Sequence, residues 1–241
     1  FEGTRLDSFT ISNNITRIEK EAFKNVQTLQ TIHIPEFVEF IGSDVFYGAT
    51  DMSNITVDSS NNNYSDVSGV LYNKDITTTL ILYPPARTDT SFTLPSTVTS
   101  IETNALYNIR NLQAIHVEDG NTTYSSINGV LCDYYKTKII RYPPARVNNS
   151  YTPPPSIENI EDGAFRQDAN LVTIYLYTAV FNTLNEDEDL DNKWVYNSQV
   201  NFYSSGLVFI RNVPTSTIFT LNDDSIIGVS INGIINEDSY N

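Results

Sequence analysis

The two histidines of the chain occupy equivalent places in copies of one strand pattern, and they are the first residues to consider for chemistry. His33 and His116 each lie between two Ile or Val residues. Neighbouring copies of the pattern place Thr56 and Tyr175 at this position, so stacked copies would align the four side chains on one exposed, concave face. No carboxylate or nucleophile recurs beside the histidines to supply a base and an orienting partner. The pattern therefore favours a binding surface over a catalytic site.

The candidate binding residues are those that the strand pattern presents on this concave face. They are Thr31, His33, Asn54, Thr56, His116, Thr173 and Tyr175. Side chains two apart on a strand point to the same face, and successive coils would repeat them. We expect no catalytic residue and no cofactor.

Two other groups of residues suggest metal or thiol chemistry. Asp187, Asp189 and Asp191 have the alternate spacing with which a calcium loop begins. The stretch lacks the glycine and the closing glutamate of that motif, so a solvated acidic loop is the favoured interpretation. The single cysteine, Cys132, excludes an internal disulfide framework, and without a Cys/His cluster a structural zinc site is not expected. Its apolar, strand-like surroundings predict a buried, inert thiol.

Five sequons are candidate glycosylation sites if the protein is secreted from a eukaryotic cell. They begin at Asn14, Asn54, Asn63, Asn121 and Asn148. The chain is rich in Asn, Ser and Thr, so chance alone accounts for this number. Asn63 and Asn121 lie in polar turns that can accept a glycan, whereas a glycan on Asn54 would crowd the strands.

These residues are carried by a sequence repeat with a short period of about 23 residues and a longer period of about 60 residues. The apolar positions Leu6, Phe9, Ile11, Ile15, Ile18 and Phe23 reappear as Leu29, Ile32, Ile34, Val38, Ile41 and Phe46. This periodicity predicts a solenoid, in which each coil has a short parallel strand, a second extended segment and a short helix. The helices are expected at 19–25, 42–48, 102–108 and 161–167, where early acidic residues suit the positive end of a helix.

Two longer segments, at about 58–92 and 118–151, interrupt the short period and are copies of each other. Each contains two apolar runs separated by a polar stretch, which predicts a β-hairpin. The return strand of each hairpin is a candidate for an extra rung of the main sheet. Each segment also contains a Tyr-Pro-Pro-Ala-Arg run, starting at Tyr83 or Tyr142. We favour a structural role for these runs, with Pro ending the hairpin strand, over polyproline recognition.

The layout resembles the BspA-like leucine-rich repeats of bacterial and protist surface proteins over residues 4 to about 177. The motifs on which the resemblance rests are Ile34-Pro35, Leu94-Pro95, Val38 to Ile41, Val98 to Ile101, Ala22-Phe23, Ala164-Phe165 and Gly69-Val70-Leu71-Tyr72. Val45-Phe46 and Ala105-Leu106 depart from the Ala-Phe element. The resemblance implies an α/β solenoid of the leucine-rich-repeat type with two hairpin insertions, and an adhesin or binding surface without catalytic activity.

The period disappears after Tyr177, which predicts two domains. The solenoid is expected over 1–177 and a β-rich terminal module over 178–241. In the module, Asn232-Gly233 between Ile231 and Ile234 is a signal for a tight hairpin turn. At the other end the chain begins directly on a repeat strand, so we expect either a fragment or an element that covers this end.

Composition narrows the partners and the function. A net charge of −15 with only 14 Lys and Arg disfavours nucleic acid, and the absence of a run of 18 apolar residues predicts no transmembrane segment. We expect an extracellular or cell-surface protein that binds a protein, a glycan or copies of itself. The alternatives are a subunit of a surface layer or head-to-tail fibre and, third, an enzyme supported only by scattered acids and two histidines.

Overall fold

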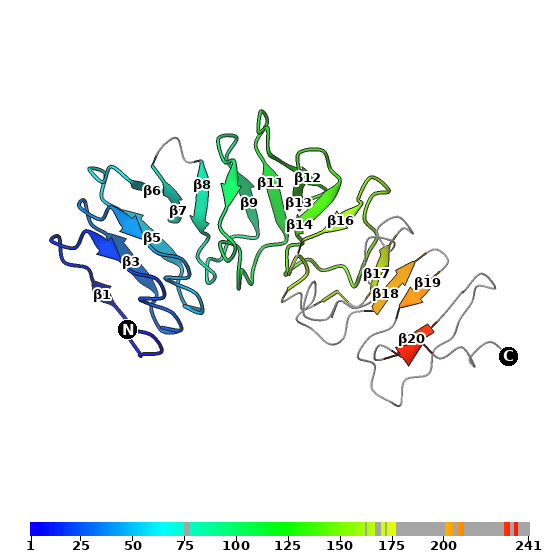
Figure 1. Ribbon diagram of the computed structural model, residues 1–241, viewed down its shortest axis with the longest axis horizontal. Helices are drawn as coiled ribbons and strands as arrows, with labels where there is room; N and C mark the ends of the chain where they lie inside the picture. The colour runs from blue at the N-terminus through cyan, green and yellow to red at the C-terminus, as the bar shows by residue number, and fades with distance from the viewer. Residues whose placement is uncertain are drawn as a thin grey trace. The chain divides into compact units, whose positions relative to one another are not determined.

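The fold is a β-solenoid built of short strands and turns (Figure 1). The computed structural model describes residues 1–74, 78–161, 163–166, 170–171, 173–176, 201–204, 207–209, 229–231 and 234–235. The chain forms two compact units, Phe1–Tyr124 and Ser125–Asn241. The predicted solenoid is confirmed, but every described element is a strand or a turn, so the helical part of the expected α/β class is not found.

In the first unit, one ladder of strands carries the short period. Strands β1 (Phe9–Thr10), β3 (Thr31–Ile34) and β5 (Asn54–Val57) form one parallel sheet. Strands β9 (Ser91–Leu94) and β11 (Ala114–Val117) form a second parallel sheet. Phe9 pairs with Ile32, Ile32 with Ile55, and Phe92 with Ile115. The two members of each pair are separated by one short period, so the spacing read from the sequence is the register of the sheet.

A second ladder contains the return strand of the first hairpin. Strand β2 (Arg17–Ile18) pairs in parallel with β4 (Phe40–Ile41). The first insertion, which we call the first hairpin, consists of three strands, β6 (Tyr64–Val67), β7 (Val70–Asn73) and β8 (Thr79–Leu82), each antiparallel to the next. The two apolar runs of the prediction are β7 and β8, and the return strand β8 pairs in parallel with β10 (Ser100–Ile101). The return strand is therefore an extra rung of this second ladder and not of the β1-β3-β5 sheet.

The helices expected at 19–25, 42–48 and 102–108 are turns, and the prediction was wrong. Glu21, Asn25, Asp44 and Asn108 have φ between 57° and 61°, in the left-handed region that interrupts a right-handed helix. Three amides of the first turn donate to carbonyls of the next coil, in the pairs Glu21 to Ser43, Phe23 to Val45 and Asn25 to Tyr47. The amides bond between coils, where a helix would direct them four residues back. The described part of the fourth segment, 163–166, is also a turn.

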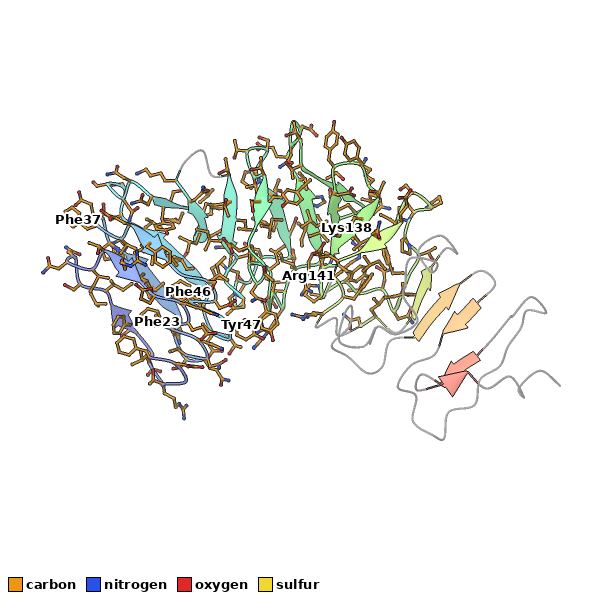
Figure 2. All side chains as sticks on the ribbon, in the orientation of Figure 1. Phe23, Phe37, Phe46, Tyr47, Lys138 and Arg141 are labelled. Atoms are coloured by element: carbon orange, nitrogen blue, oxygen red, sulfur yellow. The ribbon has the colours of Figure 1, made fainter. Side chains whose placement is uncertain are left out.

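The core of the first unit follows the repeat. Phe23 and Phe46 lie on neighbouring coils with ring centroids 5.7 Å apart and planes 17° apart (Figure 2). The buried cluster around them contains the repeated apolar positions Ile11, Ile18, Val26, Leu29, Ile32, Ile34, Val38, Val45, Ala49, Met52, Ile55 and Leu71. Each coil buries the same columns, so its strands cannot shift register without exposing them.

The second unit repeats the hairpin arrangement. Strands β12 (Tyr124–Ile127), β13 (Val130–Asp133), β14 (Lys138–Arg141) and β16 (Asn159–Ile160) form one sheet. The return strand β14 again pairs in parallel with the next coil. Lys138 forms an ion pair with Glu161, and the Nη1 of Arg141 donates to the carbonyl of Gly163 at 2.8 Å (Figure 2).

A six-stranded sheet runs past residue 177, where the period was expected to end. Its strands are β15 (Ser150–Tyr151), β17 (Thr173–Leu176), β18 (Asn201–Ser204), β19 (Leu207–Phe209), β20 (Val229–Ile231) and β21 (Ile234–Ile235). Strand β18 pairs in parallel with β17, so the sheet crosses the predicted boundary between 1–177 and 178–241, which stays a prediction. Strands β20 and β21 pair antiparallel on either side of Asn232-Gly233, which itself lies outside the described residues.

A buried asparagine fixes the start of the first hairpin. The Nδ2 of Asn61 donates to the carbonyls of Pro35 at 2.7 Å and Val38 at 3.0 Å. Its Oδ1 accepts from the amides of Asn63 and Tyr64, both at 2.8 Å. The side chain is fully buried. One side chain therefore connects the turn of the preceding coil to the first hairpin strand.

Asn121 repeats this arrangement at the start of the second hairpin. Its Nδ2 donates to the carbonyls of Pro95 and Val98, and its Oδ1 accepts from the amides of Thr123 and Tyr124. The identical bonding shows that the two hairpins are attached in the same way.

Replacing Asn61 or Asn121 with Ala is expected to lower the free energy of unfolding by about 2–4 kcal/mol. Each substitution leaves two carbonyls and two amides in a buried place without their partner. Equilibrium unfolding in urea measures the loss. Asn62→Ala, at the exposed neighbouring position, serves as the control. Equal stability of Asn61→Ala and Asn62→Ala would contradict the role of the buried side chain.

Candidate binding surface

The candidate surface is the outward side of the first strand ladder, which we call the strand face. In the first unit its residues are Thr10, Thr31, His33, Asn54, Thr56, Ser91, Thr93, Ala114 and His116. Strand β3 shows why these residues face outward: Thr31 and His33 are exposed while Ile32 and Ile34 are buried. The alternation of a half-buried strand produces the surface.

The sheet brings His33 and Thr56 together as the repeat predicted. His33 pairs in register with Thr10 on one side and Thr56 on the other. The Nδ1 of His33 lies 3.0 Å from the Oγ1 of Thr56, within hydrogen-bond distance. Thr31 and Asn54 form the parallel pair two residues earlier.

His116 lies beside Thr93, a residue that sequence reasoning missed. The predicted column placed Thr56 and His116 in neighbouring rungs, but β11 pairs with β9, and His116 is in register with Thr93. A signal for this strand was present, because Ser-Phe-Thr occurs at both 8–10 and 91–93. The side chains of the other two candidates, Thr173 and Tyr175, lie outside the described residues, although their backbone belongs to β17.

The strand face differs from the rest of the chain in charge. The chain contains 29 Asp and Glu and 14 Lys and Arg, yet the residues of the strand face are Thr, Ser, Asn, Ala and His. Hydroxyl, amide and imidazole groups both donate and accept hydrogen bonds. The face therefore offers paired hydrogen-bonding groups without a permanent charge.

The contact between His33 and Thr56 pairs a hydroxyl with an imidazole, which are two of the groups found in sites with a hydroxyl nucleophile. A hydroxyl nucleophile needs a base, a group that orients the base, and donors for the developing oxyanion. The register neighbours of His33 are both threonines, and among the described residues no carboxylate is hydrogen-bonded to its ring. Both side chains are exposed. Within the described ranges, the pair therefore has no carboxylate partner that could orient the imidazole.

The five sequons differ in their surroundings. Asn14, Asn63 and Asn148 are exposed. Asn54 is half-buried, and its amide packs so closely on Gly69 that a Cβ there would overlap it. Both amide hydrogens of Asn121 are donated to backbone carbonyls, so a glycan at this residue would break one of these bonds.

The Tyr-Pro-Pro-Ala-Arg run of the first hairpin has a structural role. Arg87 lies over the ring of Tyr83, 5.4 Å from its centroid, and its Nε donates to Asp89 at 2.7 Å. Its Nη1 donates to the carbonyl of Ser68. Ser68 and Gly69 both have positive φ, as a two-residue hairpin turn requires. The arginine therefore holds the turn against the proline segment.

The second hairpin has the same contact. Arg146 lies 5.4 Å from the ring centroid of Tyr142 and donates from Nη1 to the carbonyl of Asn128 at 2.6 Å. Asn128 and Gly129 again have positive φ. Because the contact occurs in both copies, the interpretation of these runs as structural elements is supported over a recognition role.

The thiol of Cys132 is buried in the second unit, and its environment keeps it protonated. Its side chain is fully buried on β13. Burial raises the pKa of the thiol to about 12, and the neighbouring Asp133 carboxylate adds to the increase. Since only the thiolate is a nucleophile or metal ligand, this cysteine has neither role near neutral pH.

The described ranges contain no group of three or more His, Cys, Asp or Glu side chains that could hold a metal ion. The calcium candidate formed by Asp187, Asp189 and Asp191 lies outside these ranges. None of the described elements is a helix long and apolar enough to cross a membrane.

The folded protein is expected to resist thiol reagents at pH 8. With a pKa near 12, the thiolate fraction of Cys132 is more than about a thousandfold below that of an ordinary cysteine. Absorbance with Ellman's reagent should show no reaction in buffer and one thiol per chain in guanidinium chloride. Rapid labelling of the folded protein would contradict this environment.

Comparison with known proteins places the chain in a family. The model of the BspA type leucine rich repeat region matches six copies over residues 1–78 and 87–142, more than half of the chain. No curated protein matches. The chain is similar to the crystal structure of a leucine-rich repeat protein from Eubacterium ventriosum, with 23% identity and a TM-score of 0.55 over 95% of this chain and 64% of that one.

Two further solved structures are similar at lower TM-scores. The pneumococcal vaccine antigen PcpA has 21% identity and a TM-score of 0.45 over 70% of this chain and 45% of that one. A leucine rich cell surface protein from Faecalibacterium prausnitzii has 18% identity and a TM-score of 0.36 over 84% of this chain and 66% of that one. The chain thus spans about half to two thirds of these structures. The repeat, its register and the family match together establish that this chain belongs to the BspA type leucine rich repeat family.

Proposed function

We propose that the protein is a non-enzymatic, extracellular or cell-surface protein that binds a protein or a glycan through the strand face, in adhesion or a related role. The observation that carries the proposal is the uncharged, hydrogen-bonding strand face on a chain with a net charge of −15. Membership in the BspA type family supports the surface location.

The spacing of the strand face suits a partner with regularly repeated polar groups. Neighbouring strands lie about 4.8 Å apart, and outward residues along one strand lie about 6.6 Å apart. Thr10, His33 and Thr56 form one row, and Thr31 with Asn54 begins a second. A glycan chain or an extended polypeptide presents hydroxyl or amide groups repeatedly, so several weak hydrogen bonds can add along its length.

The charge distribution supports selection of neutral groups at this face. A strongly acidic protein repels acidic partners at long range. Because the strand face has no carboxylates, a neutral partner can bind it without burying an unpaired charge. Basic partners would instead be attracted to acidic surfaces elsewhere on the chain.

Head-to-tail assembly into a surface layer or fibre is the alternative function.

The exposed sequons at Asn14, Asn63 and Asn148 are the glycosylation candidates that we retain if the chain is secreted from a eukaryotic cell.

Placing carboxylates on the strand face is expected to weaken binding at least tenfold. The variants are Thr31→Glu and Thr56→Glu, both at exposed positions, and each would require a buried, unpaired charge in the complex. The full chain is tested against an array of neutral glycans and a panel of extracellular-matrix proteins.

Thr88→Glu adds the same charge at an exposed position that is not one of the strand-face residues and is the matched control. Circular dichroism shows whether each variant folds. A protein that binds an array component equally well with Thr31→Glu, Thr56→Glu and Thr88→Glu would contradict binding through the strand face.

Secretion of the chain from a eukaryotic host is expected to give folded material with glycans at Asn14, Asn63 and Asn148 but not at Asn121. A sugar on the Nδ2 of Asn121 removes a hydrogen bond to Pro95 or Val98 in a buried site. Peptide mass spectrometry reports the occupancy of each site. Glycosylated Asn121 in material of full stability would contradict this expectation.

A further inference from the structure

A pocket of about 460 Å³ lies in the first unit, on the second ladder and its turns. Its volume is in the range of small-molecule sites. Its walls are the turns 42–48 and 102–108, and strand β8 and Tyr64 line it between them. The pocket belongs to a different side of the coil from the strand face.

The first hairpin creates the pocket by interrupting the second ladder. Strand β4 pairs with β2, whereas β8 pairs with β10 in a separate sheet. At the interruption, the amide of Ile41 donates to the hydroxyl of Tyr64 at 2.7 Å. A side chain thus replaces the strand that would otherwise satisfy this amide.

The ladder of turns is interrupted at the same coil. Amides of the first coil's turn bond to carbonyls of the second coil's turn. In the third coil the turn is replaced by the run that contains Pro84 and Pro85. There the amide of Tyr83 still donates to the carbonyl of Ala105, but neither proline has an amide hydrogen to donate. Pro85 lines the pocket. The insertion therefore removes the turn that would otherwise lie between the turns of the second and fourth coils.

These two turns meet directly beside the pocket. The rings of Tyr47 and Tyr107 stack with centroids 4.6 Å apart and planes 21° apart. The Nδ2 of Asn104 donates to the Oδ1 of Asp44 at 2.6 Å. Both contacts join residues 60 positions apart in the chain, so the walls of the pocket are fixed in the unbound protein. A pre-formed site loses less conformational entropy on binding.

The lining combines hydrogen-bonding and apolar groups. The polar side chains include Asp44, Tyr64, Glu102 and Asn104, and the apolar ones include Ile81 and Pro85. None of the described lining residues is Lys, Arg or His. Burial raises the pKa of the Tyr64 hydroxyl, the amide of Ile41 and the positive charge of Arg17 lower it, and the negative charge of Glu102 raises it.

We propose that this pocket binds one neutral sugar unit. The hydroxyls of a sugar both donate and accept, so they match carboxylates, amides and tyrosine hydroxyls together. Its C–H faces match the apolar and aromatic part of the lining. Asp44 and Glu102 repel anionic ligands. The carboxylate of Asp44 is already bonded to a neutral amide, and most of the polar lining is uncharged, which favours a sugar over an organic cation. This proposal is independent of binding through the strand face.

The test is a titration of the ¹⁵N-labelled full chain with glucose, galactose, mannose and N-acetylglucosamine. At least one sugar is expected to produce saturable shifts in the amide signals of 42–48 and 102–108. Glu102→Gln should weaken this binding about tenfold, because it exchanges a charged acceptor for a neutral one. Thr103→Trp places a bulky ring at an exposed position of the lining and should abolish it.

Glu39→Gln changes the same charge at an exposed residue of the second coil that does not line the pocket, and it should bind like the original chain. Thr56→Glu should also leave the titration unchanged, which separates this site from the strand face. n-Butylammonium is titrated in parallel as a probe for organic cations. The proposal is overturned if no sugar shifts these amides, if Glu39→Gln weakens binding as much as Glu102→Gln, or if n-butylammonium shifts these amides and the sugars do not.

Discussion

The pairing of backbone amides between successive coils is the constraint on which this structure depends. Buried amides and carbonyls must find partners, and here the partner is found one coil away along the chain, in strands and turns alike. The apolar columns around Phe23 and Phe46 can stack only because this pairing keeps each coil in register. Where the pairing is interrupted, a side chain has to replace it, as Tyr64 and Asn61 do.

The strand ladders could be predicted from the sequence because their signal is carried by side chains. Ile32 and Ile55 are buried, paired and separated by one short period, so the apolar pattern reports the register directly. The turns could not be predicted in the same way. Acidic and aromatic residues at 19–25 are compatible with a helix, and the deciding factor is the positive φ of Glu21 and Asn25 with bonds to the next coil. A single sequence does not show where a turn amide finds its acceptor.

The candidate surfaces, too, could be predicted where they follow from the pattern within one strand and not where they depend on contacts between distant segments. The outward positions of His33 and Thr56 follow from alternation within a strand, but the neighbour of His116 depended on recognising β9 after the hairpin, which only the repeated Ser-Phe-Thr indicated. The pocket could not be predicted from the sequence, because its two walls are 60 positions apart in the chain. They come into contact because the insertion removes the turn that would otherwise lie between the turns of the second and fourth coils. The insertion thus produces a surface that the simple repeat lacks.

Each hairpin brings its own attachment: an asparagine at its base and an arginine that holds its turn. In the second copy, the loop between β13 and β14 carries Tyr134 and Tyr135, which are 49% and 79% exposed. Because Asn121 and Arg146 fix the base and the turn of this hairpin, its attachment to the coil does not depend on the loop between β13 and β14. Exposed loop tips tolerate insertions and sequence changes, so the residues of this loop can be replaced while the coils of the solenoid stay unchanged.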